Sequence, residues 1–232
     1  QTFGKDVENK EIRRIIQNNI HGVDINEEAI EITQLNMFLK LATSSQQLID
    51  LSENLRVGNA LVDDPSVDPN AFTWEKEFTK IFDVIVGNPP YVRQEEFANL
   101  KSFFKKQFYC HTGTSDLYIH FIEKGLINLN DRGYFGIIVS NKWTKAKYGE
   151  KLRTFLKKYK ILQFIDFGDL PVFEDATTYP CILIIKNLDP IDNNIFVSKP
   201  KTLENKNMDL ILKQNFFYVP QNNLSVEQWS FQ

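Results

Sequence analysis

The residues best suited to chemistry are Asn88, Pro89, Pro90 and Tyr91, which follow an apolar run that ends at Val86. Two consecutive prolines lack backbone N–H groups and stiffen the turn, so the carbonyl oxygens of Asn88 and Pro89 remain free to accept hydrogen bonds. An amide oxygen, a rigid carbonyl and an aromatic ring form a cradle for a planar group that carries an amino substituent. An ordinary proline turn would use the same residues, but the strand before them and the ring after them favour the cradle.

The run that precedes this tetrapeptide, residues 81–86 (IFDVIV), predicts a buried strand interrupted only by Asp83. In open α/β sheets, ligands bind beyond the carboxyl ends of the strands. The tetrapeptide therefore stands where a functional site is expected.

Short apolar strands alternate with helices along the chain. Strands are predicted at 20–25, 54–57, 81–86, 133–139, 161–167, 180–185 and 195–197, and helices at 8–19, from 26 onward, and at 96–108, 115–129 and 148–159. Such alternation predicts an α/β fold with a mainly parallel sheet. Residues beyond 199 are polar and rich in Asn and Gln, so we expect one domain over 1–199, and a connector or the start of another domain over 200–232.

The net charge of −3 conceals a strong segregation of charge. Residues 93–160 carry 14 basic and 6 acidic side chains, a balance of +8, and the basic residues are densest between Lys142 and Lys160. A local basic face is what contacts to nucleic-acid phosphates require. A solvated helix face would give the same pattern, so charge alone leaves both readings open.

Composition excludes several other classes of protein. With 42% hydrophobic and 25% charged residues among 232, the chain can bury a core and is not disordered, and no apolar run is long enough to predict a membrane span. Two cysteines favour a reducing cytoplasm over a disulfide scaffold. Three scattered histidines, His21, His111 and His120, predict no metal site, and no G-x-G pattern provides a glycine-rich phosphate loop.

The segment Phe82–Arg93 (FDVIVGNPPYVR) resembles the catalytic motif of amino-methyltransferases that depend on S-adenosylmethionine. The similarity is greatest to gamma-class N6-adenine DNA methyltransferases, in particular to the methyltransferase region of type IIG restriction-modification enzymes. Further segments resemble the family's other motifs in the family's order: Ile20–Asn26, Val57–Leu61, Asp116–Phe121, Gly133–Trp143 and Val172–Leu183. The resemblance implies a Rossmann-like methyltransferase fold, a restriction-modification system, and a double-stranded DNA substrate with a flipped adenine.

The resemblance also implies roles for the tetrapeptide. The Asn88 side-chain oxygen and the Pro89 carbonyl would accept the two hydrogens of the target amine, whose nitrogen would then face the methyl group. Tyr91 would stack on the extruded base, and Phe173 would cover its other face. Tyr179 is the alternative for that second role, and Phe173 could equally be an aromatic residue of the core.

For the cofactor, the resemblance points to residues after two earlier strands. Asp24 would bind the ribose hydroxyls, and Ile25 would pack on the adenine of S-adenosylmethionine. Asn59, followed by Ala60, occupies a position where many relatives carry Asp, and an Asn oxygen can still accept the bond from the adenine amino group. Asp24 could instead be a helix N-cap, although Asn26 is better placed for that.

The basic stretch would then face the DNA backbone. Lys145, Lys147, Lys151 and Arg153 are the candidates for phosphate contacts, which position DNA without reading its sequence.

The sequence departs from the family at its start. The family has a glycine-rich turn after its first strand, whereas residues 1–19 contain only Gly4. We therefore expect that the first strand and the glycine-rich loop lie upstream, that the sequence-reading domain lies downstream, and that this chain is an internal fragment that needs those portions. Alone it should bind little cofactor and turn over no substrate; micromolar binding of S-adenosylmethionine in isothermal titration would overturn this.

Two alternatives remain open at the level of sequence. Methyltransferases that act on a protein glutamine or on an RNA base share the Asn-Pro-Pro-Tyr motif. A nuclease or a DNA-binding piece of a restriction enzyme is the second alternative, since Asp192 with Glu204, Asn205 and Lys206 faintly resembles a metal-nuclease spacing.

Overall fold

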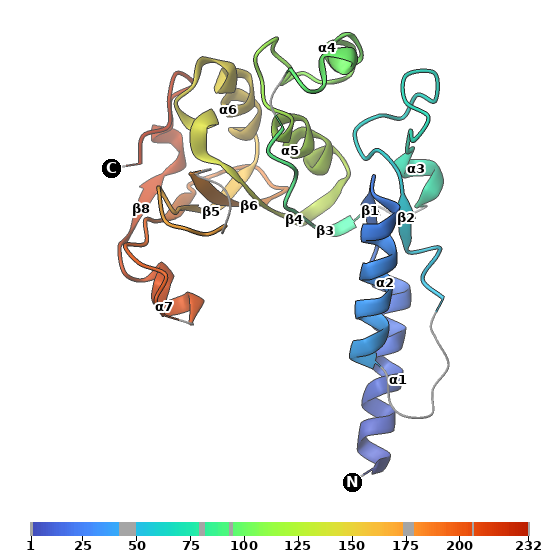
Figure 1. Ribbon diagram of the computed structural model, residues 1–232. Helices are drawn as coiled ribbons and strands as arrows, with labels where there is room; N and C mark the ends of the chain where they lie inside the picture. The colour runs from blue at the N-terminus through green and yellow to red at the C-terminus, as the bar shows by residue number, and fades with distance from the viewer. Residues whose placement is uncertain are drawn as a thin grey trace. The chain divides into compact units, whose positions relative to one another are not determined.

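The computed structural model describes residues 2–41, 50–78, 82–92, 95–173, 179–205 and 207–231. Ile81, Arg93, Lys206 and residues 174–178, all of which belong to segments considered above, lie outside the described residues. The chain divides into two compact units, residues 1–79 and 80–232. Figure 1 labels the helices and strands of both units.

The first unit contains α1 (Thr2–Asn19), β1 (Gly22–Asp24), α2 (Glu27–Leu41), β2 (Leu55–Val57) and α3 (Trp74–Glu77). Strands β1 and β2 pair in parallel, and Asp24 lies opposite Val57 in the register. Parallel pairing brings the carboxyl ends of both strands to one edge. The Asn54 side chain fixes the start of β2 by donating hydrogen bonds to the carbonyls of Gln17 (2.8 Å) and Ile20 (2.9 Å).

Helix α2 begins where the sequence predicts. The Asn26 side-chain oxygen accepts hydrogen bonds from the N–H groups of Glu28 (2.9 Å) and Ala29 (3.3 Å), so Asn26 is the N-cap. Glu27 and Glu28 also place negative charge at the positive end of the helix dipole. Asp24 is consequently not used as the cap.

The second unit is built on a six-stranded sheet in the order β3-β4-β6-β5-β7-β8. Its strands are β3 (Phe82–Gly87), β4 (Leu129–Ser140), β5 (Lys160–Asp166), β6 (Pro180–Lys186), β7 (Asn194–Ser198) and β8 (Phe216–Pro220). The pairs β3/β4 and β5/β7 are parallel, and β4/β6, β5/β6 and β7/β8 are antiparallel. The predicted α/β class is confirmed, but the sheet is mixed, because β5 returns to β6 without a crossover helix among the described residues.

Strand direction decides where a site can form in this sheet. Both β4 and β5 run antiparallel to β6, and β3 runs parallel to β4. The carboxyl ends of β3, β4 and β5 therefore lie at one edge of the sheet. That edge carries the Asn88-to-Tyr91 segment, the 141–149 segment and the 167–173 segment.

Helices α5 (Tyr118–Ile127) and α6 (Glu150–Leu156) share a hydrophobic core with this sheet, α4 (Lys101–Gln107) packs on α5 through Phe104 and His120, and α7 (Met208–Leu212) precedes β8. Short 3₁₀ turns span Ala98–Leu100, Asn141–Thr144, Lys147–Gly149 and Gln221–Asn223. Helix α5 approaches β4 closely at Gly125, where a Cβ atom would lie 2.3 Å from the Phe135 ring. The helix predicted at 148–159 is shorter, because it begins in a 3₁₀ turn at Lys147–Gly149 and continues only as the seven-residue helix α6.

The polar tail is a correction to the sequence analysis. Strand β8 pairs with β7 across the predicted boundary at residue 199, and Trp229 and Phe231 are buried in the same core as Trp143 and Phe164. The aromatic residues that lie between the polar ones bury their side chains in this core and attach the segment to the sheet. Residues 207–231 therefore continue the second unit. None of the described helices is long and apolar enough to cross a lipid bilayer.

Candidate functional site

The tetrapeptide follows directly after β3 and bears out the position that the sequence predicts. Asn88 and Pro90 are exposed, Pro89 is buried, and Tyr91 is half-buried. Strand β3 is the edge strand of its sheet, and its face with Val84 and Val86 is open, with Val86 78% exposed. The turn thus presents the Asn88 side chain outward from a rigid, buried proline.

The ring of Tyr91 lies against Phe173, with the two centroids 5.9 Å apart and the planes at 67°. The structure therefore brings together the two aromatic residues that the resemblance assigns to base stacking, although they are 82 positions apart in the sequence. Among the described residues, the Tyr91 hydroxyl is buried without a hydrogen-bond partner, and burial raises the pKa of Tyr91 to about 12. Tyr91 is thus a neutral aromatic ring at neutral pH.

Tyr179, the alternative stacking residue, lies at the other end of the same connection between β5 and β6. It is 42% exposed and has a φ of 48°, in the left-handed region that residues with a side chain seldom adopt. Its carbonyl accepts a hydrogen bond from the N–H of Asn141 (2.9 Å). Backbone strain of this kind is concentrated at functional segments.

A buried network supports the tetrapeptide from α5. The N–H of Leu117 donates to the carbonyl of Val92 (3.2 Å), which fixes the end of the motif. Next to it, the Tyr148 hydroxyl donates to Asp116 (3.1 Å) and lies 2.8 Å from the Tyr118 hydroxyl. Sequence reasoning missed Tyr148 as part of this support, because its partners Tyr118 and Asp116 are 30 and 32 residues away.

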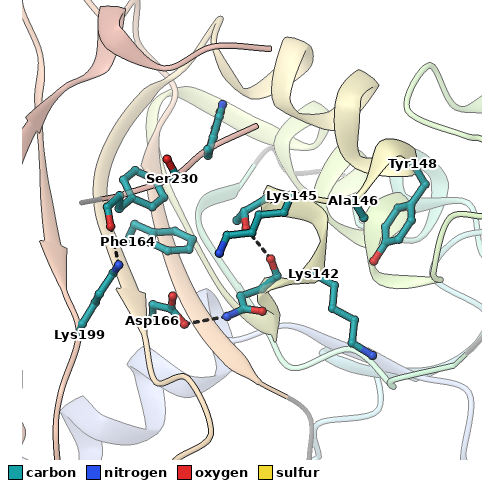
Figure 2. A pocket seen from close by; sticks show the side chains of 12 residues that line it. Lys142, Lys145, Ala146, Tyr148, Phe164, Asp166, Lys199 and Ser230 are labelled. Atoms are coloured by element: carbon teal, nitrogen blue, oxygen red, sulfur yellow. Dashed lines mark hydrogen bonds between the residues drawn. The ribbon is translucent and has the colours of Figure 1, made fainter. Parts of the chain in front are cut away.

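A hollow of about 490 Å³ lies beyond the carboxyl ends of β4 and β5 (Figure 2). Figure 2 shows Lys145 and Asp166 extending into it from different elements. Asp166 accepts a hydrogen bond from the Asn141 side chain (2.8 Å), and Lys199 bonds to the Phe231 carbonyl at its far side. The lining residues are Asn141, Lys142, Thr144, Lys145, Ala146, Tyr148, Phe164, Asp166, Lys199, Trp229, Ser230 and Phe231.

The four predicted cofactor residues meet in the first unit, at the carboxyl ends of β1 and β2. The N–H of Gly58 donates to the Asp24 carbonyl (2.8 Å), which joins the two strand ends. Asp24 is exposed, and one of its carboxylate oxygens accepts the N–H of Asn26 (2.8 Å). Ile25 is 55% exposed beside it, so an acidic group and an apolar side chain face solvent together.

Asn59 is held by a residue that sequence reasoning missed. Its side-chain nitrogen donates to Asp68 (2.7 Å), and its side-chain oxygen accepts the N–H of Leu61 (3.0 Å). Asp68 thereby fixes the orientation of the amide and supplies a carboxylate next to it. Ala60 is fixed too, because its carbonyl accepts a hydrogen bond from the Trp74 indole (2.9 Å). No short-range pattern links Asp68 to Asn59 in the sequence.

These residues fit a nucleoside with a ribose diol. One Asp24 oxygen is engaged by the helix start, which leaves the other suited to accept from hydroxyl groups. The Asn59 oxygen retains a second lone pair for an amino group. Beneath the loop, Phe72 packs so tightly on Gly58 that a Cβ atom there would lie 2.9 Å from its ring, and Gly58 is consequently a fixed point of the turn.

Of the four basic residues predicted to contact phosphate, three are exposed and one is not. Lys145, Lys147 and Lys151 reach the surface. Arg153 is 1% exposed, and its guanidinium donates hydrogen bonds to the backbone carbonyls of Trp143, Ala146, Val226 and Glu227. The prediction for Arg153 is wrong, because a guanidinium whose donors are all turned inward cannot reach a phosphate.

The histidines also differ from expectation. His111 and His120 appear scattered in the sequence, yet their ring nitrogens lie 3.0 Å apart. Desolvation and the neighbouring His111 lower the pKa of His120 to about 3, so His120 is neutral. Among the residues that the structure describes, no group of three or more His, Cys, Asp or Glu side chains converges as metal ligands would.

A family model and the curated relatives all point to methyltransferases of restriction-modification systems. Residues 18–173 match the family described as Eco57I restriction-modification methylase. The chain is 37% identical over 133 residues to the type II methyltransferase M.BstVI of Geobacillus stearothermophilus, covering 55% of this chain and 24% of that protein. It is 31% identical over 207 residues to the type II restriction enzyme and methyltransferase RM.Eco57I of Escherichia coli, covering 79% of this chain and 20% of that protein.

Solved structures with the same fold are more distant in sequence. A DrdV–DNA complex superposes with a TM-score of 0.66 at 13% identity, over 91% of this chain and 25% of that one. A nuclease-deletion mutant of the type ISP restriction-modification enzyme LlaGI, in complex with a DNA substrate mimic, gives 0.65 at 14% identity, over 96% and 23%. The chain spans about a fifth to a quarter of the length of the two curated relatives compared.

Proposed function

Because the chain belongs to the Eco57I family of restriction-modification methylases, we propose that it forms part of a DNA methyltransferase that acts on the N6 amine of adenine. The observation that carries this proposal is the Asn88-Pro89-Pro90-Tyr91 turn at the carboxyl end of β3, with Phe173 against the Tyr91 ring. The turn offers acceptors and the rings offer a stacking surface. The geometry supports binding of a planar base with an amino group, and the choice of double-stranded DNA as the substrate rests on the family.

Asn88 and Pro89 would act by position and electrostatics. The lone pair of an exocyclic amine is delocalised into the base, so the nitrogen is a weak nucleophile. Two acceptors, the Asn88 side-chain oxygen and the Pro89 carbonyl, would hold both hydrogens and favour a pyramidal nitrogen. The buried ring of Pro89 keeps this carbonyl in place, and neither Pro89 nor Pro90 has a backbone N–H.

Tyr91 and Phe173 would hold the extruded adenine. A base between two parallel rings needs them about 7 Å apart, twice the contact distance of ~3.5 Å between stacked carbons. Their edge-to-face arrangement at 5.9 Å is narrower than that. Entry of the base would thus turn one ring and open the pair, and Phe173, on the connection between β5 and β6, is the better candidate to move.

Asp24, Ile25, Asn59 and Ala60 would hold S-adenosylmethionine, with Asp68 orienting Asn59. When bound, this cofactor supplies the methyl group as a sulfonium. Asp24 would accept from the ribose hydroxyls, Ile25 would cover one face of the adenine, and Asn59 would accept from its amino group. Lys145, Lys147 and Lys151 would contact DNA phosphates. Because its substrate would be DNA, we place the protein in the cytoplasm.

The test is methyl transfer by the enzyme that contains these residues. Purified enzyme, labelled S-adenosylmethionine and unmethylated duplex DNA would be incubated, and the DNA digested to nucleosides for mass spectrometry. We expect N6-methyladenine. N4-methylcytosine would contradict the adenine assignment, because the same two acceptors could hold the cytosine amine.

Parallel reactions address the other candidates. Label incorporated into a protein glutamine or an RNA base, with none in duplex DNA, would replace the proposal with one of those methyltransferases. Cleavage of the duplex without cofactor would support the nuclease alternative for this polypeptide.

A further inference from the structure

A second hollow, distinct from the one in Figure 2, lies between α4, α6 and the loop that joins α4 to α5. Its volume is about 470 Å³. Its lining residues are Lys101, Ser102, Lys105, His111, Thr112, Gly113 and Lys151. This hollow, here called the lysine hollow, is lined by three ammonium groups, and none of its described lining residues is a carboxylate.

The fold fixes how these lysines converge. Lys101 and Lys105 are four residues apart on α4 and therefore share one helix face, while Phe103 and Phe104 are buried on the other side. Lys151 reaches across from α6 and donates a hydrogen bond to the His111 carbonyl (3.1 Å). The bond holds its charged end at the loop.

The loop leaves room for a ligand beside these charges. A Cβ atom built on Gly113 would meet nothing within 4 Å, so the backbone is open there. The Thr112 hydroxyl, on the same loop, is buried and lacks a hydrogen-bond partner among the described residues. An anion in the lysine hollow would offer that hydroxyl an acceptor.

The three lysine charges of the hollow all act on the His111 imidazole. Desolvation lowers the pKa of His111, and Lys151, Lys101 and Lys105 lower it further. The imidazole is faced by Lys101 and Lys105 from α4, by Lys151 from α6 and by His120 from α5, and His120 is neutral. The three lysines therefore all raise the positive potential at this imidazole.

We propose that the lysine hollow binds a phosphodiester of the DNA backbone. This rests on the proposed function for the choice of DNA. A polyanion is favoured over a single small anion because the positive surface continues past the hollow: the ammonium groups of Lys151 and Lys158 lie 5.9 and 5.7 Å from the exposed Tyr109 ring. At the end of this loop, the N–H of Leu117 donates a hydrogen bond to the carbonyl of Val92, the residue that follows the tetrapeptide.

The test measures binding of a fluorescein-labelled duplex to the 232-residue chain by anisotropy, without cofactor, at several salt concentrations. The double variant Lys101→Gln/Lys105→Gln should bind about tenfold more weakly at low salt and lose about 1 from the slope of log K against log salt, as expected for one phosphate. The control is Lys106→Gln, which removes one charge from α4 outside the hollow and is matched to the single variant Lys105→Gln. Lys106→Gln should weaken the affinity by less than about twofold and should leave the slope of log K against log salt nearly unchanged.

The outcomes separate the site from mere net charge. Equal losses for Lys105→Gln and Lys106→Gln, each alone, would overturn the proposal. Inorganic phosphate added as competitor should displace DNA only at concentrations that also act as salt. Displacement at sub-millimolar phosphate, lost in the double variant, would assign the hollow to a free anion and overturn the DNA assignment. Because no methyl transfer is measured, failure of the proposed function would leave this result interpretable.

Discussion

Asn88 shows how one exposed amide can depend on the rigid residues around it. It follows an edge strand and precedes a buried proline, so a rigid backbone presents its side chain to solvent. A group placed in this way can stabilise a transition state without a cost of reorganisation.

Replacing Asn88 should therefore affect chemistry more than binding. In the complete enzyme, Asn88→Ala should lower single-turnover methyl transfer about 100- to 1,000-fold, the loss typical for one electrostatic group. Binding of S-adenosylmethionine, measured by titration, should change by less than about threefold. Asn222→Ala, at an exposed asparagine of the last 3₁₀ turn, is the control and should be unaffected. Full activity of Asn88→Ala would refute the assigned role.

Arg153 makes the opposite point, since a basic residue in a basic stretch serves the fold. Its guanidinium joins the 141–149 segment to the tail through four backbone carbonyls. Burial lowers its pKa, but the group is charged at neutral pH.

Arg153→Leu should lower the free energy of unfolding by about 3 kcal/mol or more, because several buried carbonyls lose their donors. Urea unfolding followed by tryptophan fluorescence would measure this, since Trp143 and Trp229 lie nearby. Lys145→Gln, at an exposed lysine, should stay within about 0.5 kcal/mol. The sequence prediction would be restored if an Arg153 variant kept wild-type stability and its DNA binding showed a salt dependence smaller by one phosphate contact.

At the scale of elements, α4 and α5 are joined by an aromatic cluster around His120. The imidazole stacks on Phe104 with centroids 4.4 Å apart and is completely buried. A neutral histidine in this setting ties the loop of the lysine hollow to the helix that follows the tetrapeptide.

Stability should therefore fall in acid. The unfolded chain protonates His120 near pH 6.5, whereas the pKa of about 3 keeps the folded form neutral, so this stability is present above pH 6.5 and is lost as the pH falls toward 3. The loss approaches ~1.4 kcal/mol per pH unit for one proton. Because carboxylates titrate there too, the measurement is the difference between wild type and His120→Phe. Identical pH profiles would contradict the burial of a neutral imidazole.

At the scale of the whole molecule, the second unit is completed by the last residues of the chain. Trp229 is 1% exposed and packs edge-on against Trp143 with centroids 5.1 Å apart, and Phe231 stacks on Phe164 at 4.4 Å. These contacts make the tail a part of the core next to the 141–149 segment.

Trp229→Ala should cost about 3 to 5 kcal/mol of unfolding free energy, as large-to-small changes in a core do. Chemical denaturation followed by far-UV circular dichroism would measure it. Gln228→Ala, at the exposed neighbour, should be neutral to within about 0.5 kcal/mol. A small effect at Trp229 would return the tail to the role of a connector.

Much of the fold and of the site was already determined by the sequence. Apolar runs bounded by turns specified most strands, Asn26 specified the start of α2, and the tetrapeptide at the end of an apolar run specified where catalysis should be sought. These features are local: a strand, a cap and a proline turn depend on a few neighbouring residues, and their physical causes can be read within that window.

Only the tertiary structure decided which distant residues meet. It joined Tyr91 to Phe173, Asp68 to Asn59 and His111 to His120, turned Arg153 inward, and paired β8 with β7. Charge and polarity in a sequence do not say which way a side chain faces. That direction follows from strand order and from the burial of apolar residues elsewhere in the chain, and the same physical cause gathers three lysines around one hollow.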